Sequence, residues 1–202
     1  YLGPAEDLIA DFPRIDIEIP REEILGRIEG LYEEFSHYCA YADAYDAVRA
    51  KGEPRLSPTR LKDVPDWPEN MAIRDRRAEI RRQHGAVGER ACYFTEGGYC
   101  TLFSEGMKLA GNGGADELIA KAASLVYEDE FGHMCKGIVG LDREDMSDAD
   151  WERMTDLSEE LAGMRIDMRN AQFSFPLPAE RIAAIKGGDI DPIVFDFDKA
   201  TA

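Results

Sequence analysis

The sequence predicts an all-helical protein organised as a four-helix bundle. Four long segments carry apolar residues at steps of three and four, the spacing of one buried helical face. The alternation typical of a strand is almost absent. Runs of proline and glycine separate the long segments at the places where helices should end. Together these observations favour a bundle of amphipathic helices over mixed or all-strand architectures.

Composition narrows the classes of function. The 202-residue chain is 44% hydrophobic and 32% charged, which is ordinary for one globular domain. Its net charge of -17 argues against nucleic-acid binding, which needs Lys and Arg against phosphates. No stretch approaches the ~18 uninterrupted apolar residues of a membrane helix. Four cysteines without a C-x-x-C motif favour a reducing compartment. We therefore expect a cytoplasmic protein that binds neither nucleic acid nor membrane.

The N-terminal segment, residues 1–20, is punctuated by proline. Because Ile15, Ile17 and Ile19 alternate with acids, we expect an extended arm there. The first long helix is expected from about Arg21 to Ala50, where apolar residues recur at helical spacing.

A proline-rich connection follows over residues 51–69 and is too rich in proline for a helix interior. Connections of this length often serve as a lid or a crossover. The second long helix is expected over Glu69–Ala110, either continuous or broken near Gly85–Gly88. Glycines between Gly111 and Gly114 should end it.

The third helix is expected from about Ala115 to Gly140. Ser147 or Asp148 can cap the fourth, whose apolar pattern ends near Phe173. A short helix near Ala179–Lys186 is expected beyond it. The predicted parts are an N-terminal arm (1–20), a helical bundle (21–173) and an extended C-terminal tail (174–202).

Two of the three histidines follow a glutamate by three positions, in Glu34-x-x-His37 and Glu130-x-x-His133. Residues three apart on a helix are surface neighbours, so a carboxylate oxygen and an imidazole nitrogen can reach one metal ion. Glu130 and His133 also continue the apolar face of the third helix. Two such pairs on separate helices predict metal ligands, with intrahelical ion pairs as the alternative.

Lone carboxylates on the other helices are the next candidates. Glu96 falls on the apolar face of the second helix, where an unpaired carboxylate is costly. We expect it to bind metal, with pairing to an arginine such as Arg165 as the alternative. Glu160 on the fourth helix is the candidate for the last carboxylate ligand, and Glu89 is its rival.

Basic residues gather at one place in this acidic chain. The five are Arg74, Arg76, Arg77, Arg81 and Arg82. We interpret them as a solvated helix face. The alternative is an anchor for an acidic partner or an anionic substrate.

On these motifs the chain resembles the ferritin-like carboxylate-bridged di-iron or di-manganese proteins. In that family a four-helix bundle supplies one Glu from each of two helices and a Glu-x-x-His from each of the other two. The resemblance covers roughly residues 21–173. It rests on Glu34, His37, Glu96, Glu130 and His133, with Glu160 provisional.

The order of the motifs departs from the family's usual order, in which a lone Glu precedes each Glu-x-x-His. Here a Glu-x-x-His comes first, followed by a lone Glu, the second Glu-x-x-His and a candidate lone Glu. Either the bundle is cyclically shifted, or one ligand differs. The third alternative is a resemblance to the heme-oxygenase-like di-iron oxidases, in which His84 would matter.

The resemblance implies two bound iron ions, with manganese as the alternative, because carboxylate and imidazole ligands suit both metals. The expected function is a di-iron oxidase or monooxygenase that uses dioxygen on a small organic substrate. A ferritin-type ferroxidase and a metal-free helical interaction module are the alternatives. Electrons would come from a separate donor protein or from the substrate. The proline-rich insert and the tail favour a lid and a homodimer over a storage cage.

Overall fold

The computed structural model describes residues 2–143, 145–173 and 175–196. Within these ranges the chain is helical throughout, and the only pairing of extended backbone is an isolated bridge between Ile15 and Ile19. The all-α prediction is confirmed. The parts of the predicted arm and tail that fall on residues 1, 174 and 197–202 lie outside the described residues.

The chain forms two compact units, each assembled from two stretches of sequence. The first unit consists of Tyr1–Pro65 and Phe103–Val126, and the second consists of Asp66–Leu102 and Tyr127–Ala202. Two helices contribute to both units: α5 (Gly97–Met107) and α6 (Gly114–Lys136).

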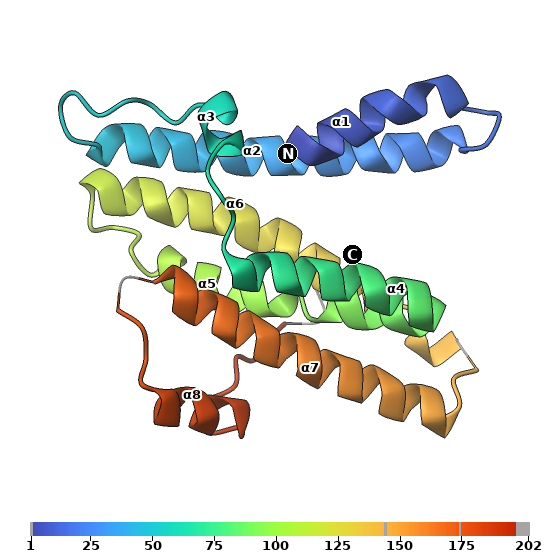
Figure 1. Cartoon of the computed structure of the whole chain (residues 1–202). Coiled ribbons are helices and arrows are strands. Elements are labelled where there is room, and N and C mark those ends of the chain that lie inside the picture. Colours follow the sequence, from blue (N-terminus) through green and yellow to red (C-terminus); the bar gives the residue numbers. More distant parts are fainter. Residues whose placement is uncertain (1, 144, 174, 197–202) are drawn as a thin grey trace. The chain divides into compact units, whose positions relative to one another are not determined.

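The first unit is built on α1 (Leu2–Asp11) and α2 (Arg21–Val48), which pack against each other (Figure 1). A single 3-10 turn, η1 (Phe12–Arg14), joins them, and the short helix α3 (Pro58–Lys62) lies in the proline-rich connection. The end of α5 and the first half of α6 complete the unit. The predicted first long helix is therefore confirmed.

The N-terminal segment is helical where an extended arm was expected, so that prediction was wrong. Leu8 on α1 packs with Ile19 and Ile24 in a small core, and burial of these side chains stabilises the helix. Pro4 is compatible with it because proline is tolerated in a first helical turn. The isoleucine alternation lies after the helix, in a turn that leaves Ile17 81% exposed. It therefore marks a turn.

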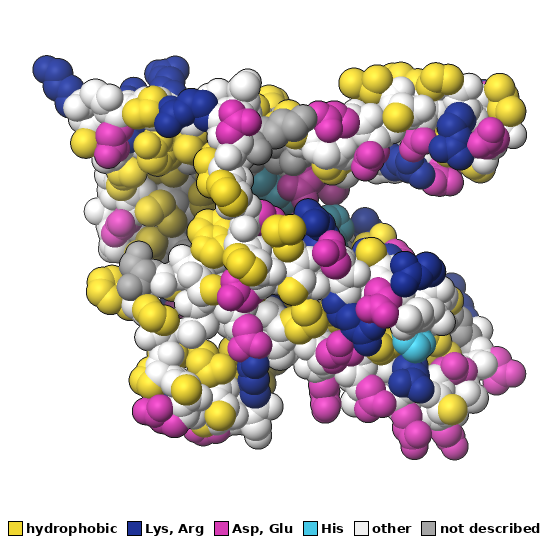
Figure 2. Space-filling view, in the orientation of Figure 1, with side chains coloured by type: hydrophobic (Ala, Val, Ile, Leu, Met, Phe, Trp, Pro, Cys, Tyr) yellow, Lys and Arg dark blue, Asp and Glu magenta, His cyan; other side chains and the backbone are white. Residues whose placement is uncertain are grey.

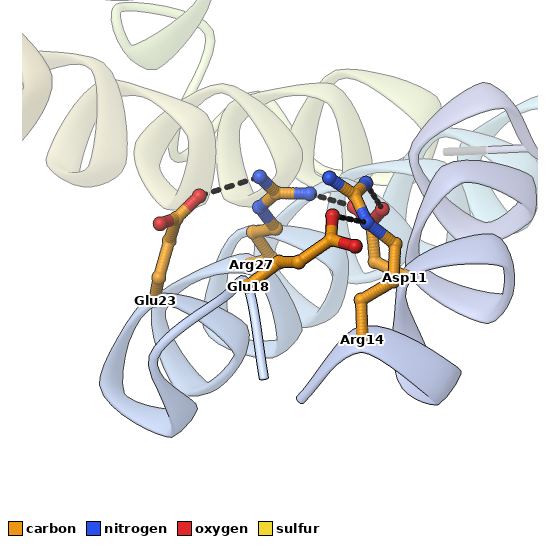
Figure 3. A network of polar contacts seen from close by, with 5 residues as sticks. All are labelled: Asp11, Arg14, Glu18, Glu23 and Arg27. Atoms are coloured by element: carbon orange, nitrogen blue, oxygen red, sulfur yellow. Dashed lines mark hydrogen bonds and ion pairs between the residues drawn. The ribbon is translucent and has the colours of Figure 1, made fainter. Parts of the chain in front are cut away.

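Ion pairs tie the end of α1 to α2 around the buried Asp11 (Figure 3). Asp11 accepts a hydrogen bond from Arg14 at 2.9 Å and another from Arg27 on α2. Arg14 also pairs with Glu18, and Arg27 with Glu23. Since the outer members are exposed, each contributes little alone. The Asp11 carboxylate, which both arginines share, links the end of α1 to α2.

The second unit is built on α4 (Pro68–Phe94), which packs along α7 (Asp148–Gln172). The beginning of α5, the end of α6, the 3-10 turn η2 (Leu141–Arg143) and α8 (Ala179–Lys186) complete it. The core between α4 and α7 consists of Ile73, Ile80, Ala91, Cys92, Met154, Leu157, Leu161 and Met168. The apolar face predicted for the fourth helix is confirmed at Met154, Leu157, Leu161 and Met168.

Helix α4 is a hairpin of two helical arms, because Gly85 adopts φ 52° and ψ -129° and breaks the helix. Figure 1 shows the second arm returning beside the first. The arms meet at Gly88, where a Cβ atom would lie 2.6 Å from the Ile80 carbonyl oxygen. Arg81 on one arm donates to Glu89 on the other at 2.7 Å. The break foreseen near Gly85–Gly88 is confirmed, and it reverses the chain.

Helix α7 begins at Asp148 and is capped by Ser147, one of the two caps that the sequence predicted. The Ser147 hydroxyl accepts from the Asp150 amide, and the Asp150 carboxylate accepts from the Ser147 amide, which forms a capping box. The short helix predicted near the C-terminus is α8. It is held to α7 by Lys186, which donates to Asp167 at 2.6 Å.

The cysteines are free thiols: Cys39 is exposed, and Cys92, Cys100 and Cys135 are buried. None of the helices in the described ranges combines the length and the apolar character needed to cross a bilayer. The cytoplasmic location stays a prediction.

Candidate metal centre

Three of the predicted ligands come together in the second unit. Glu96, Glu130 and His133 each offer one ligand atom, and these atoms all lie within 4.8 Å of one another. Glu96 is 9% exposed, while the other two are partly buried. The Nδ1 atom of His133 lies 3.5 Å from Oε2 of Glu96. Within the part of the chain that the structure describes, this is the only such group of three or more.

Glu96 does not lie inside a continuous helix, as the sequence suggested, but in the turn between α4 and α5. The buried Thr95 hydroxyl donates to the Cys92 carbonyl at 2.9 Å and satisfies a carbonyl at the end of α4. The Glu96 amide donates to the Tyr93 carbonyl at 2.9 Å. This tight turn presents the carboxylate to α6.

Two glycines let that turn approach its neighbours. A Cβ atom at Gly97 would collide with the side chain of Met134 on α6. At Gly98 a Cβ atom would lie 2.7 Å from Cδ of Arg165 on α7. Close approach to the neighbouring helices therefore accounts for both glycines.

Arg77, on the first arm of α4, is the direct partner of Glu96. Its Nη2 atom donates to Oε1 of Glu96 and, at 3.3 Å, to the carbonyl of Cys92. Burial alone would lower the pKa of Arg77, but the charge and the hydrogen bond of Glu96, with smaller effects of Cys92 and Tyr99, together raise the pKa above its usual value. The guanidinium is therefore charged. It holds one carboxylate oxygen and leaves Oε2 directed toward His133.

Helix α6 carries the other two members on one face, since Glu130 and His133 are three residues apart. Beside them lies the thiol of Cys100. Burial, reinforced by the Glu130 charge, raises the pKa of Cys100 to about 12, so this thiol stays protonated at neutral pH. The Arg165 charge acts on the same thiol in the opposite direction. The group itself consists of two carboxylates and one imidazole, so its ligand atoms are oxygen and nitrogen.

The other predicted Glu-x-x-His pair lies on α2 in the first unit. Glu34 is exposed and His37 is partly buried. Their participation in a metal site stays a prediction.

Both candidates for the last carboxylate have arginine partners. Glu160 accepts from Arg76 Nε at 2.7 Å and from Nη2 at 2.9 Å, and Glu89 accepts from Arg81. Neither belongs to the group around Glu96. His84 lies close enough to Glu160 for its charge to lower the pKa of that carboxyl, an effect smaller than that of Arg76. A metal role for Glu160 stays a prediction.

The Arg76–Glu160 pair predicts an acid dependence of stability. The hydrogen bonds from Arg76 lower the pKa of Glu160, so its stabilising effect is present above the unfolded pKa of about 4.3 and is lost as pH falls through the folded pKa. We expect the free energy of unfolding to fall less steeply below about pH 4.5 in Glu160→Gln than in the wild type. Because Glu160 is 41% exposed, its contribution at neutral pH should stay below about 1 kcal/mol. Urea unfolding at several pH values measures this.

The neighbouring exposed residue provides the control, because Glu159→Gln should keep the wild-type slope. If Glu160→Gln also kept that slope, the ion pair would have no role in acid stability.

The five arginines do not all lie on the solvated helix face that the sequence predicted. Over the outer face of α4, basic and acidic side chains lie next to one another (Figure 2). Arg74, Arg76 and Arg81 pair with acids there. Arg77 instead points inward, with 16% of its side chain exposed.

The sequence did not single out a second inward arginine as a functional residue. Arg165 on α7 is 4% exposed, and its guanidinium carbon lies 3.6 Å from the ring centroid of Tyr99. Arg169, one turn later, lies 4.9 Å from the same centroid. The available signal was the spacing, because Arg165 falls four residues after Leu161 and three before Met168 on the buried face.

Comparisons of this chain with models of protein families, with curated protein sequences and with solved structures find no match.

Proposed function

We propose that this protein is a non-heme metal-dependent oxidoreductase of the ferritin-like di-iron kind, which uses dioxygen to oxidise a small organic molecule. The observation that supports the proposal is the convergence of Glu96, Glu130 and His133 from two separate segments. Two carboxylates and an imidazole are donors that suit iron or manganese.

The spacing of the donors fits one ion. Ligand atoms about 2.1 Å from a common metal lie roughly 3–4 Å apart, close to the spread seen here. The 3.5 Å between His133 Nδ1 and Glu96 Oε2 is already in this range. Small side-chain movements would bring the three ligand atoms to the separations expected around one ion.

A cation also explains why these groups lie together. Arg77 neutralises Glu96, while Glu130 adds a second negative charge at the same place. Partly buried carboxylates repel each other, and a divalent ion between them removes the repulsion. When bound, a pair of iron ions supplies the one-electron chemistry of dioxygen that side chains lack.

The protein residues have their own tasks in this proposal. Arg77 orients Glu96 by occupying one carboxylate oxygen, as outer partners of metal ligands do. The protonated Cys100 thiol and the apolar Met134 flank the group and limit access of water. The roles of Glu34 and His37 as metal ligands stay a prediction from the sequence.

The first test is metal content after anaerobic loading with Fe(II) or Mn(II), measured by mass spectrometry of the desalted protein. Wild type should retain metal, and Glu130→Gln and His133→Ala should weaken binding by at least tenfold. Glu128→Gln is the matched control, because Glu128 is an exposed acid two residues before Glu130 on α6. Retention of metal by both site variants would refute the site.

The second test separates the classes of function. Air added to the Fe(II)-loaded protein should cause oxygen uptake that stops after one stoichiometric oxidation in the absence of organic substrate. Continued oxidation of many equivalents of Fe(II) would instead indicate ferritin-type iron handling. Binding of manganese alone, without iron-dependent oxygen uptake, would leave a metal site but exclude the oxygenase.

A further inference from the structure

Arg165 is a buried cation whose hydrogen-bonding capacity is unused. Its Nε, Nη1 and Nη2 atoms are all buried, and none hydrogen-bonds to any atom of the described residues. The side chain is 4% exposed. A buried guanidinium is normally paired with an anion or with carbonyls, because an unpaired buried charge is strongly unfavourable. The missing partner is therefore an acceptor that does not belong to the described residues.

Three acids of the second unit form ion pairs with other arginines. Glu96, the partner suggested by the sequence, is taken by Arg77. Glu160 and Glu89 pair with Arg76 and Arg81.

The surroundings of Arg165 are cationic and aromatic. The guanidinium lies over the Tyr99 ring at 3.6 Å, and Arg169 approaches the same ring. The hydroxyl of Ser158, two turns earlier on the same side of α7, is also buried without a hydrogen-bond partner in the described residues. The Arg165 guanidinium and the Ser158 hydroxyl on α7 can therefore both donate hydrogen bonds to an oxygen acceptor of a ligand.

A glycine lies beside the aliphatic part of the Arg165 side chain. Gly98 is exposed, and its missing side chain leaves its α-carbon next to the aliphatic part of Arg165. The neighbouring Leu161 and Met168 on α7 are almost fully buried, so the guanidinium has apolar side chains beside it. A ligand that satisfies both features has an anionic end and an apolar body.

We propose that Arg165 binds the carboxylate of a small, apolar organic acid, and that this acid belongs to the substrate class of the enzyme. The planar guanidinium matches a carboxylate through two parallel hydrogen bonds, and the apolar Leu161 and Met168 beside it on α7 favour an apolar body. The substrate part of this inference rests on the proposed metal-dependent oxidation. The two sites lie close together, because a Cβ atom at Gly98, two residues after Glu96, would lie 2.7 Å from Cδ of Arg165.

The binding test uses benzoate, with neutral benzamide of the same shape and inorganic phosphate as comparison probes. The metal is removed first with 1,10-phenanthroline, because a polycarboxylate chelator would compete for the site. Calorimetric titration should show saturable benzoate binding to the wild type that weakens at least tenfold in Arg165→Met. Arg165→Lys should lie between them, since it keeps the charge but loses the planar fork. Arg181→Met, which removes an exposed cation on α8, should bind like the wild type.

A second measurement does not depend on any probe. If Arg165 awaits a ligand, Arg165→Met removes an unpaired buried charge, so the melting temperature of the ligand-free protein should rise by roughly 2 °C or more. Arg165→Gln, which is polar and uncharged, serves in place of the methionine variant if that variant does not fold. A fall in melting temperature in a folded variant would mean that Arg165 is structural, and would overturn the proposal.

The remaining outcomes are decisive as well. Tighter binding of phosphate than of benzoate would overturn the organic acid, and equal binding of benzamide would overturn the anionic end. Absence of benzoate binding in a protein that loads metal would end this inference and leave the proposed function standing. Benzoate binding in a protein that fails to load metal would retain the anion site and end the proposed function.

Discussion

Replacing Glu96 by glutamine is expected to lower the free energy of unfolding by about 3 kcal/mol, near the lower end of the range for breaking a buried ion pair. Arg77 and Glu96 keep only 16% and 11% of their side-chain exposure, so the guanidinium would be left charged and poorly solvated. Arg77 would retain the Cys92 carbonyl, which is a weaker partner. Urea unfolding of the metal-free protein at pH 7 measures the change.

The matched control is Glu89→Gln. Glu89 also pairs with an arginine of α4, but the two side chains are 41% and 37% exposed, so the expected loss is about 0–1 kcal/mol. Equal losses in the two variants would show that burial of the Arg77–Glu96 pair has no energetic consequence.

The reciprocal variant connects stability to the metal. Arg77→Met leaves the Glu96 carboxylate without its cation, so this variant should be destabilised when metal-free. Added Mn(II) should recover more stability in Arg77→Met than in the wild type, because the ion then supplies the missing positive charge. Thermal unfolding with and without Mn(II) gives the comparison. Failure of Mn(II) to stabilise either protein would contradict ligation by Glu96.

Replacing Gly137 by alanine is expected to cost about 1–3 kcal/mol, the usual range for overpacking a closely packed site. A Cβ atom there would lie 2.6 Å from the Phe94 amide nitrogen and 2.7 Å from the Arg90 carbonyl oxygen. Both contacts are with backbone, which cannot rotate away as a side chain can. Chemical unfolding measures the loss. The added methyl would separate the region following α6 from the second arm of α4, near the turn that carries Glu96.

Gly163→Ala on α7 is the control with the opposite sign. Nothing lies within 4 Å of a Cβ atom at that position, so the substitution should stabilise the helix by about 0.5–1 kcal/mol. A Gly137→Ala protein as stable as this control would mean that the close approach relaxes at little cost.

Local pattern was enough to predict several features because each depends on residues near one another in sequence. The apolar spacing of α7, its Ser147 cap and the short α8 were foreseen because helical periodicity and capping act over a few residues. The pairing of Glu130 with His133 on one face of α6 follows from the same geometry.

Other features depended on partners distant in sequence. The N-terminal helix was missed because Leu8 is stabilised by Ile19 and Ile24, which a local alternation of isoleucines does not reveal. The reversal of α4 at Gly85 was foreseen only as a break, since a glycine permits many backbone conformations.

At the candidate site the sequence determined which residue types are available, and the tertiary structure decided which of them meet. It selected Arg77 from a run of arginines as the partner of Glu96 and left Arg165 on the Tyr99 face. Charge pairing depends on distances across helices, and these are set by which glycines allow close approach. Gly97 and Gly98 therefore matter for the site as much as its ligands do, because they allow the Glu96 turn to lie against α6 and α7.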